Sequence, residues 1–191
     1  MLFNLIRGEV LKITVGQQGY PATYKSGGGG GTFVATDDNS PMIIAGGGGG
    51  GGNSGGAGKH AVTTEDGTVG AVTHITGGSG GYASPNGYNH GYGTAGAGFY
   101  SSAVSDIGNG ITTNALGFIY GGTGANGPAG MGGFGGGGGG GNNGGGGGGG
   151  YSGGATGGGG GGSYNGGSNQ SSPAQGNNGH GKVIIAKILV S

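Results

Sequence analysis

GGFGGGGGGGNNGGGGGGGYSGG, residues 132–154, has almost no side chains. Two glycine runs, 135–141 and 144–150, are separated by Asn142 and Asn143. Ordering glycine costs more backbone entropy than ordering any other residue, and glycine brings no side chain to offset that cost in a core. Glycine does let backbones approach closely. A polyproline II helix has three residues per turn and no internal hydrogen bonds, so its peptide groups point outward. We therefore predict polyglycine II rods that bond side by side, with the asparagine pair as a turn.

Glycine runs of similar length at 27–31, 46–52 and 157–162 fit such a stack. The alternative is a flexible linker, because a chain with this much glycine and no period is normally disordered. Linkers usually contain serine throughout, whereas these runs are pure, and collagen would need glycine at every third position. The structural glycines that we single out are Gly46, Gly49, Gly138, Gly147 and Gly160.

Apolar residues gather in strand-like segments at both ends of the chain. In 2–15 they alternate with polar residues from Val10 onward, and Gly8 marks a bend. In 32–45 the stretches TFVAT and PMIIA flank the turn cluster DDNS, which predicts a hairpin. KVIIAKILV at 182–190 is rich in β-branched residues and predicts a closing strand. The sequence therefore predicts a mainly β fold with almost no α-helix, whose first and last strands come from opposite ends of the chain.

Charge and cysteine content exclude several classes of protein. The chain of 191 residues has 6 basic and 6 acidic residues, so it has no basic surface for nucleic acid. It has no cysteine, which excludes disulfides and thiolate metal sites. No apolar run reaches the length of a membrane span.

Motifs of enzymes occur in the chain only in incomplete form. GNNGHGKV (176–183) matches a phosphate-binding loop until Val183, which replaces the required Ser or Thr, and the stretch continues as a predicted strand instead of a helix. GYSGG (150–154) fits a nucleophile elbow but lacks the alternating strands and helices of a hydrolase. The histidines are widely spaced and lack carboxylate partners: His60, His74, His90 and His180. We predict no catalytic residues, no metal site, no cofactor and no enzymatic activity.

A tyrosine-rich segment, YASPNGYNHGYGTAGAGFY at 82–100, is the candidate binding surface. Tyrosine among Ser, Gly and Asn is the composition of antibody binding loops, because the ring offers an apolar face and a polar tip at low entropic cost. The candidate ligand-binding residues are Tyr82, Tyr88, His90, Tyr92 and Tyr100. The same rings could instead cap rod ends or pack against the rim of the bundle, and both interpretations stay open.

Several stretches resemble one known family: LFNLIRGEVLKITVGQQG, GGGGGTFVAT, SPMIIAGGGGG and GGFGGGGGGG. They are similar to the glycine-rich domain of the anaplastic lymphoma kinase and leukocyte tyrosine kinase receptors and of bacterial and phage proteins. The resemblance runs in order from residue 2 to about 164. It implies a jelly-roll-like β-sandwich that supports a polyglycine II bundle, in an extracellular setting. The receptors' kinase and membrane span are absent here, so their signalling role does not carry over.

The resemblance also has a gap, because the family domain normally begins earlier, with further strands before the FNL stretch. Met1 therefore falls inside an expected strand, so the missing part comes from another chain or the sequence is trimmed. Similar bundles occur in phage tail-tip adhesins, where loops at the end of the bundle recognise the host.

Taken together, these features predict a single domain over 1–191. It consists of a partial sandwich fused to a bundle, with strand segments at 2–15, 32–45 and 182–190, bundle segments at 27–31, 46–58 and 121–167, and loop insertions over 60–120. We expect a non-enzymatic recognition module on an extracellular or virion surface, such as a tail-fibre tip adhesin. Its partners would be a host-surface polysaccharide or outer-membrane protein. The alternative is a structural subunit of a filament or coat, formed when the sheets of separate chains pair.

Overall fold

The computed structural model describes residues 1–22, 25–52, 56–71, 75–85, 91–104, 110–174 and 176–188. Regular elements are few. They are β1 (Leu11–Thr14), β2 (Thr32–Thr36), β3 (Pro41–Ala45), the short 3-10 helix η1 (Phe118–Tyr120) and β4 (Tyr164–Asn165). The strands form one antiparallel sheet in the order β1-β2-β3-β4. The mainly β, almost helix-free character predicted from the sequence is therefore present in the described residues.

The hairpin predicted over 32–45 forms the centre of this sheet. Phe33 in β2 faces Ile44 in β3, and both side chains are buried. The turn between the strands is closed by the Thr36 N–H, which donates to the Ser40 carbonyl at 3.0 Å. Asn39 takes a left-handed φ of 64°, which asparagine tolerates better than most residues. Local turn chemistry therefore places the hairpin where the sequence predicted it.

The outer strands differ from the prediction. The predicted strand over 182–190 is not found, because 182–188 contains no strand and residues 189 and 190 lie outside the described residues. The fourth strand is β4, which follows the last glycine run instead. In the segment 2–15 only β1 is a strand, while Leu2 forms an isolated bridge to Ser168. Gly8 has φ +96°, as expected for a bend between the two parts.

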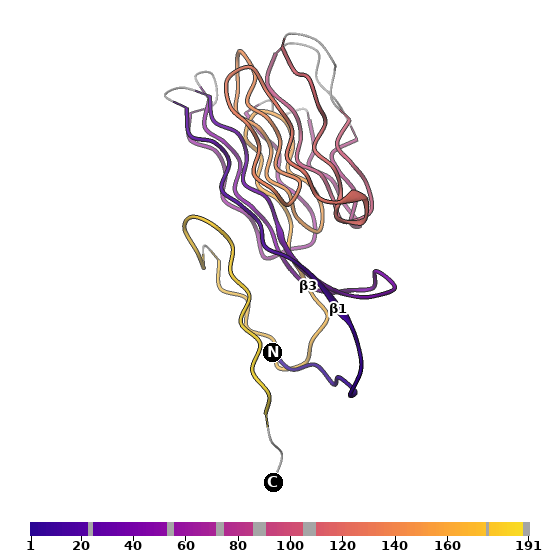
Figure 1. The fold of residues 1–191 in the computed structure, drawn as a ribbon. Coiled ribbons are helices and arrows are strands. Elements are labelled where there is room, and N and C mark those ends of the chain that lie inside the picture. The colour runs from indigo at the N-terminus through magenta and orange to yellow at the C-terminus, as the bar shows by residue number, and fades with distance from the viewer. Residues whose placement is uncertain are drawn as a thin grey trace.

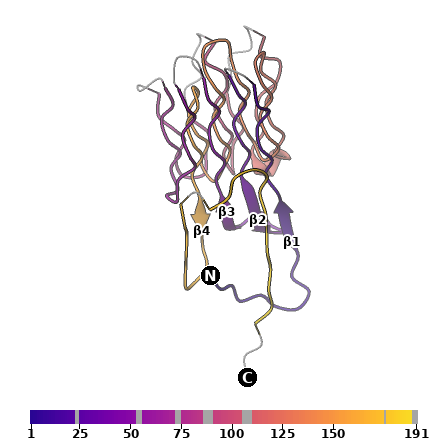
Figure 2. The same ribbon diagram turned by 90° about the vertical axis from the view of Figure 1, so that its left-hand side faces the viewer.

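Most of the chain forms what we call the glycine bundle, the hydrogen-bonded segments of residues 16–31 and 46–162 as far as these are described. Figure 1 shows these segments running side by side away from the sheet, and Figure 2 shows β1 to β4 at one end of the bundle. The opposite end, which we call the far end, includes the turn at Asn142 and Asn143. There the Gly141 N–H donates to the Gly144 carbonyl at 2.9 Å, as the predicted asparagine turn requires.

Hydrogen bonds in the bundle repeat every three residues. The backbone N–H groups of 146–151 donate in turn to three neighbouring segments: Gly146 and Gly149 to Ser26 and Gly29, Gly147 and Gly150 to Thr94 and Ala97, and Gly148 and Tyr151 to Gly159 and Gly162. The donor–acceptor distances are 3.1, 2.9, 2.9, 3.3, 2.8 and 2.9 Å in that order, and all but the Gly150 bond fall within the usual range of about 2.7–3.2 Å. A strand would repeat every two residues and an α-helix every 3.6. A period of three is that of the polyproline II helix.

The segment 144–150 lies at the centre of the bundle, because other segments also donate to it. Its carbonyls accept from Gly47, Gly50, Gly138 and Gly154, which belong to segments distinct from the three that accept its N–H groups. The central segment is thus hydrogen-bonded on all sides. Since buried backbone groups must be paired, such bonding replaces the side-chain core that glycine cannot provide.

Glycine is required at the bundle positions singled out from the sequence, because backbone atoms of a neighbour occupy the space of a Cβ. A Cβ built on each would lie far inside van der Waals contact of a carbonyl oxygen: at Gly46 2.4 Å from Gly161, at Gly49 2.1 Å from Gly158, at Gly138 2.3 Å from Thr94, at Gly147 2.3 Å from Gly154 and at Gly160 2.0 Å from His60. Any larger residue would force the segments apart.

Segments outside the glycine runs also join the bundle, which differs from the loop insertions predicted over 60–120. The N–H groups of Thr68 and Ala71 donate to the carbonyls of Gly160 and Gly157 at 2.8 and 2.9 Å. The segment 94–97 flanks the central segment in the same way.

The largest side chains pack where the bundle meets the sheet. Phe33 and Ile44 from the sheet contact Phe99 and Tyr151 from the bundle, and all of them are buried. A second cluster inside the bundle consists only of alanines: Ala83, Ala95, Ala97, Ala103, Ala115 and Ala125. The aromatic cluster therefore joins the sheet to the bundle, while the bundle itself is held chiefly by its backbone.

Candidate functional site

Two of the predicted binding residues, Tyr82 and Tyr100, belong to the aromatic cluster near the sheet. Their ring centroids lie 5.9 Å apart. The Tyr100 ring meets Phe99 edge-on at 4.8 Å and Tyr151 at 6.4 Å. Tyr100 is partly buried, whereas Tyr82 is 56% exposed. Tyr100 therefore has the packing role that the sequence left open, and Tyr82 is the exposed margin of the same cluster.

The environment of this cluster changes the acidity of two tyrosines. Burial raises the pKa of Tyr151, and the nearby Tyr100 and Glu65 act in the same direction. Burial is also the main cause that raises the pKa of Tyr100, followed by Tyr164 and Tyr82. Both phenols are thus held in their neutral form, in which the hydroxyl remains a hydrogen-bond donor.

Tyr92 lies at the other end of the bundle. It packs against the buried pair Ile75 and Ala155, and its carbonyl accepts from the Gly157 N–H at 3.3 Å. A Cβ on Gly144, which follows the turn at the far end, would lie 3.0 Å from the Tyr92 ring. Tyr92 is therefore a residue of the far end.

The five candidates do not form one surface in the part of the chain that is described. Tyr82 and Tyr100 lie beside the sheet and Tyr92 lies at the far end. Tyr88 and His90 lie outside the described residues. Residues that are close in sequence are separated here because the segment 93–99 runs the length of the bundle. Of the candidates that the structure describes, Tyr92 alone lies at the far end.

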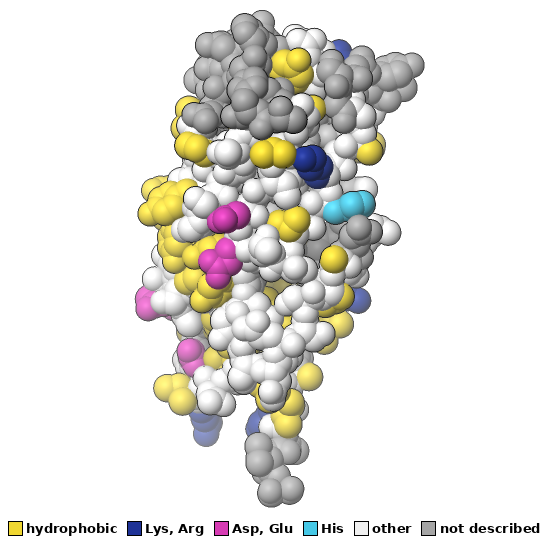
Figure 3. Space-filling model, turned by 180° about the vertical axis from the view of Figure 1, so that it is seen from behind, with side chains coloured by type: hydrophobic (Ala, Val, Ile, Leu, Met, Phe, Trp, Pro, Cys, Tyr) yellow, Lys and Arg dark blue, Asp and Glu magenta, His cyan; other side chains and the backbone are white. Residues whose placement is uncertain are grey.

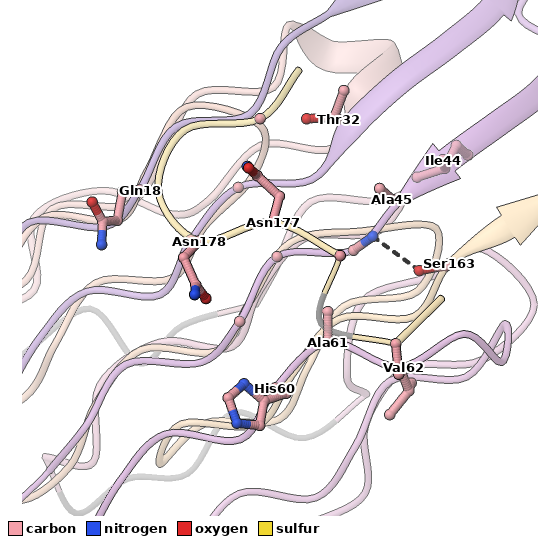
Figure 4. A pocket seen from close by; sticks show the side chains of 18 of the residues that line it. Gln18, Thr32, Ile44, Ala45, His60, Ala61, Val62, Ser163, Asn177 and Asn178 are labelled. Atoms are coloured by element: carbon pink, nitrogen blue, oxygen red, sulfur yellow. Dashed lines mark hydrogen bonds between the residues drawn. The ribbon is translucent and has the colours of Figure 1, made fainter. Parts of the chain in front are cut away.

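A groove runs along one side of the bundle and was not predicted from the sequence. Its volume is about 670 Å³. Its walls include Gln17 and Gln18 on one side and Gly46–Gly51 and the 60–63 segment on the other. The segment 177–181, which we call the strap, passes across it (Figure 4). The strap is held by the Gly181 N–H, which donates to the Gly16 carbonyl at 2.7 Å, and by His180 Nδ1, which accepts from the Gln18 N–H at 3.3 Å.

The groove offers hydrogen-bonding groups and little charge. Its polar side chains are amides, hydroxyls and one imidazole: Gln17, Gln18, Ser26, Thr32, His60, Thr63, Ser163, Asn165, Ser171, Ser172, Asn177 and Asn178. Among the described residues that line it, Lys182 is the one charged side chain and none is a carboxylate. Such a surface suits a neutral polar ligand and carries no acid–base pair. Sequence reasoning missed these residues because they come from seven separate stretches of the chain with no motif between them.

The surface in Figure 3 has few, scattered charges, with apolar side chains between them. Within the described residues, no group of three or more His, Cys, Asp or Glu side chains is placed to hold a metal ion. The same residues include no helix with the length and hydrophobicity of a membrane span. Neither observation adds a site to those already described.

Comparisons with protein-family models, with curated proteins and with solved structures each found no match for this chain.

Proposed function

We propose that this protein is a non-enzymatic recognition module, exposed outside the cell or on a virion, of the tail-fibre tip adhesin type. The observation that supports this function best is the backbone-bonded bundle. Its three-residue period fits polyglycine II rods, and rods bonded on several sides form a stiff scaffold without a large core. A stiff scaffold can hold a binding surface at a fixed distance from the attached sheet.

The far end is the surface that we assign to recognition. It combines Tyr92 with Asn142 and Asn143, and the Asn143 N–H donates to the Gly91 carbonyl at 2.8 Å. An aromatic ring beside amide groups can stack on a sugar and hydrogen-bond its hydroxyls. A host-surface polysaccharide or an outer-membrane protein is therefore the proposed ligand. The resemblance to the glycine-rich domain family supports the same setting.

Antibody labelling of the native particle under the electron microscope tests this proposal. Label confined to the tip of a fibre is the expected result, and Tyr92→Ala should then reduce adhesion to host cells without changing the fibre. Continuous label along a filament or coat would overturn the adhesin function.

A second function, a filament or coat subunit, is favoured by the exposed apolar side chains of the sheet end. Ile6, Val10 and Ile184 are 79%, 58% and 77% exposed. The edge of β1 is also open to pairing, since β1 is the first strand in the sheet order. Sedimentation over a range of concentrations separates the functions, because an adhesin forms a discrete species and a filament subunit forms concentration-dependent polymers.

A further inference from the structure

The glycine segment 46–52 lacks one neighbour that the hydrogen-bond pattern of the bundle calls for. Gly47 and Gly50 donate to Gly149 and Gly146, and Gly49 and Gly52 donate to Lys59 and Gly56, with distances of 2.7 to 2.9 Å. The third set in this period of three is Gly48 and Gly51. Neither of these N–H groups donates a hydrogen bond within the described part of the chain. Two free donors thus face the same direction, about 9 Å apart along the segment.

The groove occupies the position of this missing neighbour. Gly29 forms its floor, because the Gly29 N–H donates to the Gly48 carbonyl while the next residue, Gly30, donates to the Gln17 carbonyl, both at 2.8 Å. The segment 26–31 therefore lies between the two walls. The groove is lined by Gln17, Ser26, Gly27, Gly29, Gly30, Gly48 and Gly51. The groove is thus the space between the segments 17–18 and 46–51, above the segment 26–31.

Glycine at three groove positions is not required by the rest of the chain. A Cβ at Gly29, Gly48 or Gly51 would have its nearest neighbour at 3.5, 3.6 and 3.5 Å, which is ordinary contact. None of the three has a left-handed φ. On the other faces of the same segments, a Cβ at Gly28 or Gly47 would lie 2.1 or 2.3 Å from a carbonyl oxygen. A side chain is therefore absent from the groove face although the fold has room for it.

The strap shows how a peptide group fits at the sheet end of this space. The Gly181 N–H bonds to the Gly16 carbonyl, and a Cβ on Gly181 would lie 2.0 Å from Thr32 Oγ1. Even here only glycine fits. From Gly181 back to Asn177 the strap crosses the groove. Its carbonyls therefore do not accept hydrogen bonds from the N–H groups of Gly48 and Gly51.

We propose that the groove binds an extended, glycine-rich segment of another polypeptide as an additional rod of the bundle. The bound segment places carbonyl oxygens at three-residue intervals against the N–H groups of Gly48 and Gly51. Its residues facing Gly29 are glycine, because a rod approaching this floor meets the same spacing as the rods inside the bundle. This binding site lies on the side of the bundle and is independent of the far end assigned to recognition.

Fluorescence anisotropy with labelled peptides and the full chain tests the proposal. The peptide KGGGGGGGK carries a glycine run as long as 144–150. KGVGVGVGK is its control of equal length and charge, because its three valines point to all three faces of a rod with three residues per turn. We expect saturable binding of the first peptide and binding weaker by about tenfold or more for the second. Absence of saturable binding by the glycine peptide overturns the proposal.

A methyl group on the groove floor provides the matched variant. Gly29→Ala should retain the melting temperature and lower the affinity for KGGGGGGGK by about tenfold or more. Ala71→Val adds bulk on an exposed part of another flank and should leave the affinity unchanged. Should Gly29→Ala unfold, Gly48→Ala serves in its place. Equal affinity of the wild type and the folded variant would overturn the proposal.

A second copy of the chain is the competing occupant. Sedimentation of the wild type and of Gly29→Ala without peptide identifies it. Self-association that Gly29→Ala abolishes and that KGGGGGGGK does not inhibit would assign the groove to another copy, and would overturn binding of a separate glycine-rich partner.

Discussion

Phe99 from the bundle stacks on Phe118 from η1, with ring centroids 4.7 Å apart and planes inclined by 18°. Phe33 of β2 lies 5.1 Å from Phe118 and 6.2 Å from Phe99, so a single aromatic group joins three parts of the chain. The bundle has few other large buried side chains. Most of the hydrophobic stabilisation between sheet and bundle therefore depends on these rings.

Phe99→Ala should lower the free energy of unfolding by about 3–5 kcal/mol, because Phe99 is fully buried and its loss leaves a cavity. Chemical denaturation followed by circular dichroism measures the change. Tyr120→Ala, at a side chain that is 58% exposed beside the same cluster, should cost less than about 1 kcal/mol. Equal effects of the two substitutions would show that the cluster does not join sheet to bundle.

Gly147→Ala should destabilise the protein by about 3 kcal/mol or more, since the new Cβ would lie 2.3 Å from the Gly154 carbonyl oxygen and force two segments apart. Gly48→Ala has no such clash. It should be neutral or stabilising by up to about 1 kcal/mol, because alanine restricts the unfolded chain. Thermal melting of both variants is the measurement. Tolerance of Gly147→Ala would mean that the runs are flexible and not packed.

Tyr100→Ala and Tyr82→Ala should differ in their effect on stability. Tyr100 packs against Phe99 and Tyr151, so its loss should lower the free energy of unfolding by about 2 kcal/mol, whereas loss of the exposed Tyr82 should lower it by about 0.5 kcal/mol or less.

Tyr92→Ala is the binding variant and should weaken attachment to the host surface. Adhesion assays beside melting curves separate the roles. Loss of adhesion in Tyr82→Ala alone would move the recognition surface to the sheet end.

Stability should fall at alkaline pH because of Tyr151 and Tyr100. Burial raises the pKa of both above the usual tyrosine value of about 10. When the folded pKa is the higher one, the unfolded chain loses its protons first. The contribution is therefore complete below about pH 10 and is lost as the pH rises through the folded pKa values. Melting temperatures from neutral to alkaline pH measure this loss, and Tyr151→Phe should reduce the slope. An unchanged slope in that variant would exclude Tyr151 as a cause.

Local features of the sequence predicted the parts of the fold that depend on neighbouring residues. The hairpin at 32–45 follows from alternating strands and a turn cluster, and the turn at Asn142 follows from two equal glycine runs. The β-branched residues of 182–190 predict a strand, of which the structure describes 182–188. No strand is found there, because a strand also needs a partner edge, and propensity alone supplies none.

The candidate site was predicted less well, for a different reason. Sequence proximity placed Tyr82, Tyr92 and Tyr100 together, but the segment 93–99 spans the bundle and carries nearby residues to opposite ends. The groove has no sequence motif at all. It exists because Gly48 and Gly51 lack a neighbour, and that absence is a property of the packed bundle.

The sequence by itself determined that the backbone must supply the contacts, because runs of pure glycine contain nothing else that can bond. Only the tertiary structure decided which runs became neighbours. The Gly147 N–H donates to the Thr94 carbonyl at 2.9 Å, and nothing in the glycine run distinguishes that acceptor from many others. Identical peptide groups do not distinguish one hydrogen-bond partner from another. The partners are therefore selected by the sheet, the aromatic cluster and the lengths of the connecting segments, which act together only in the folded chain.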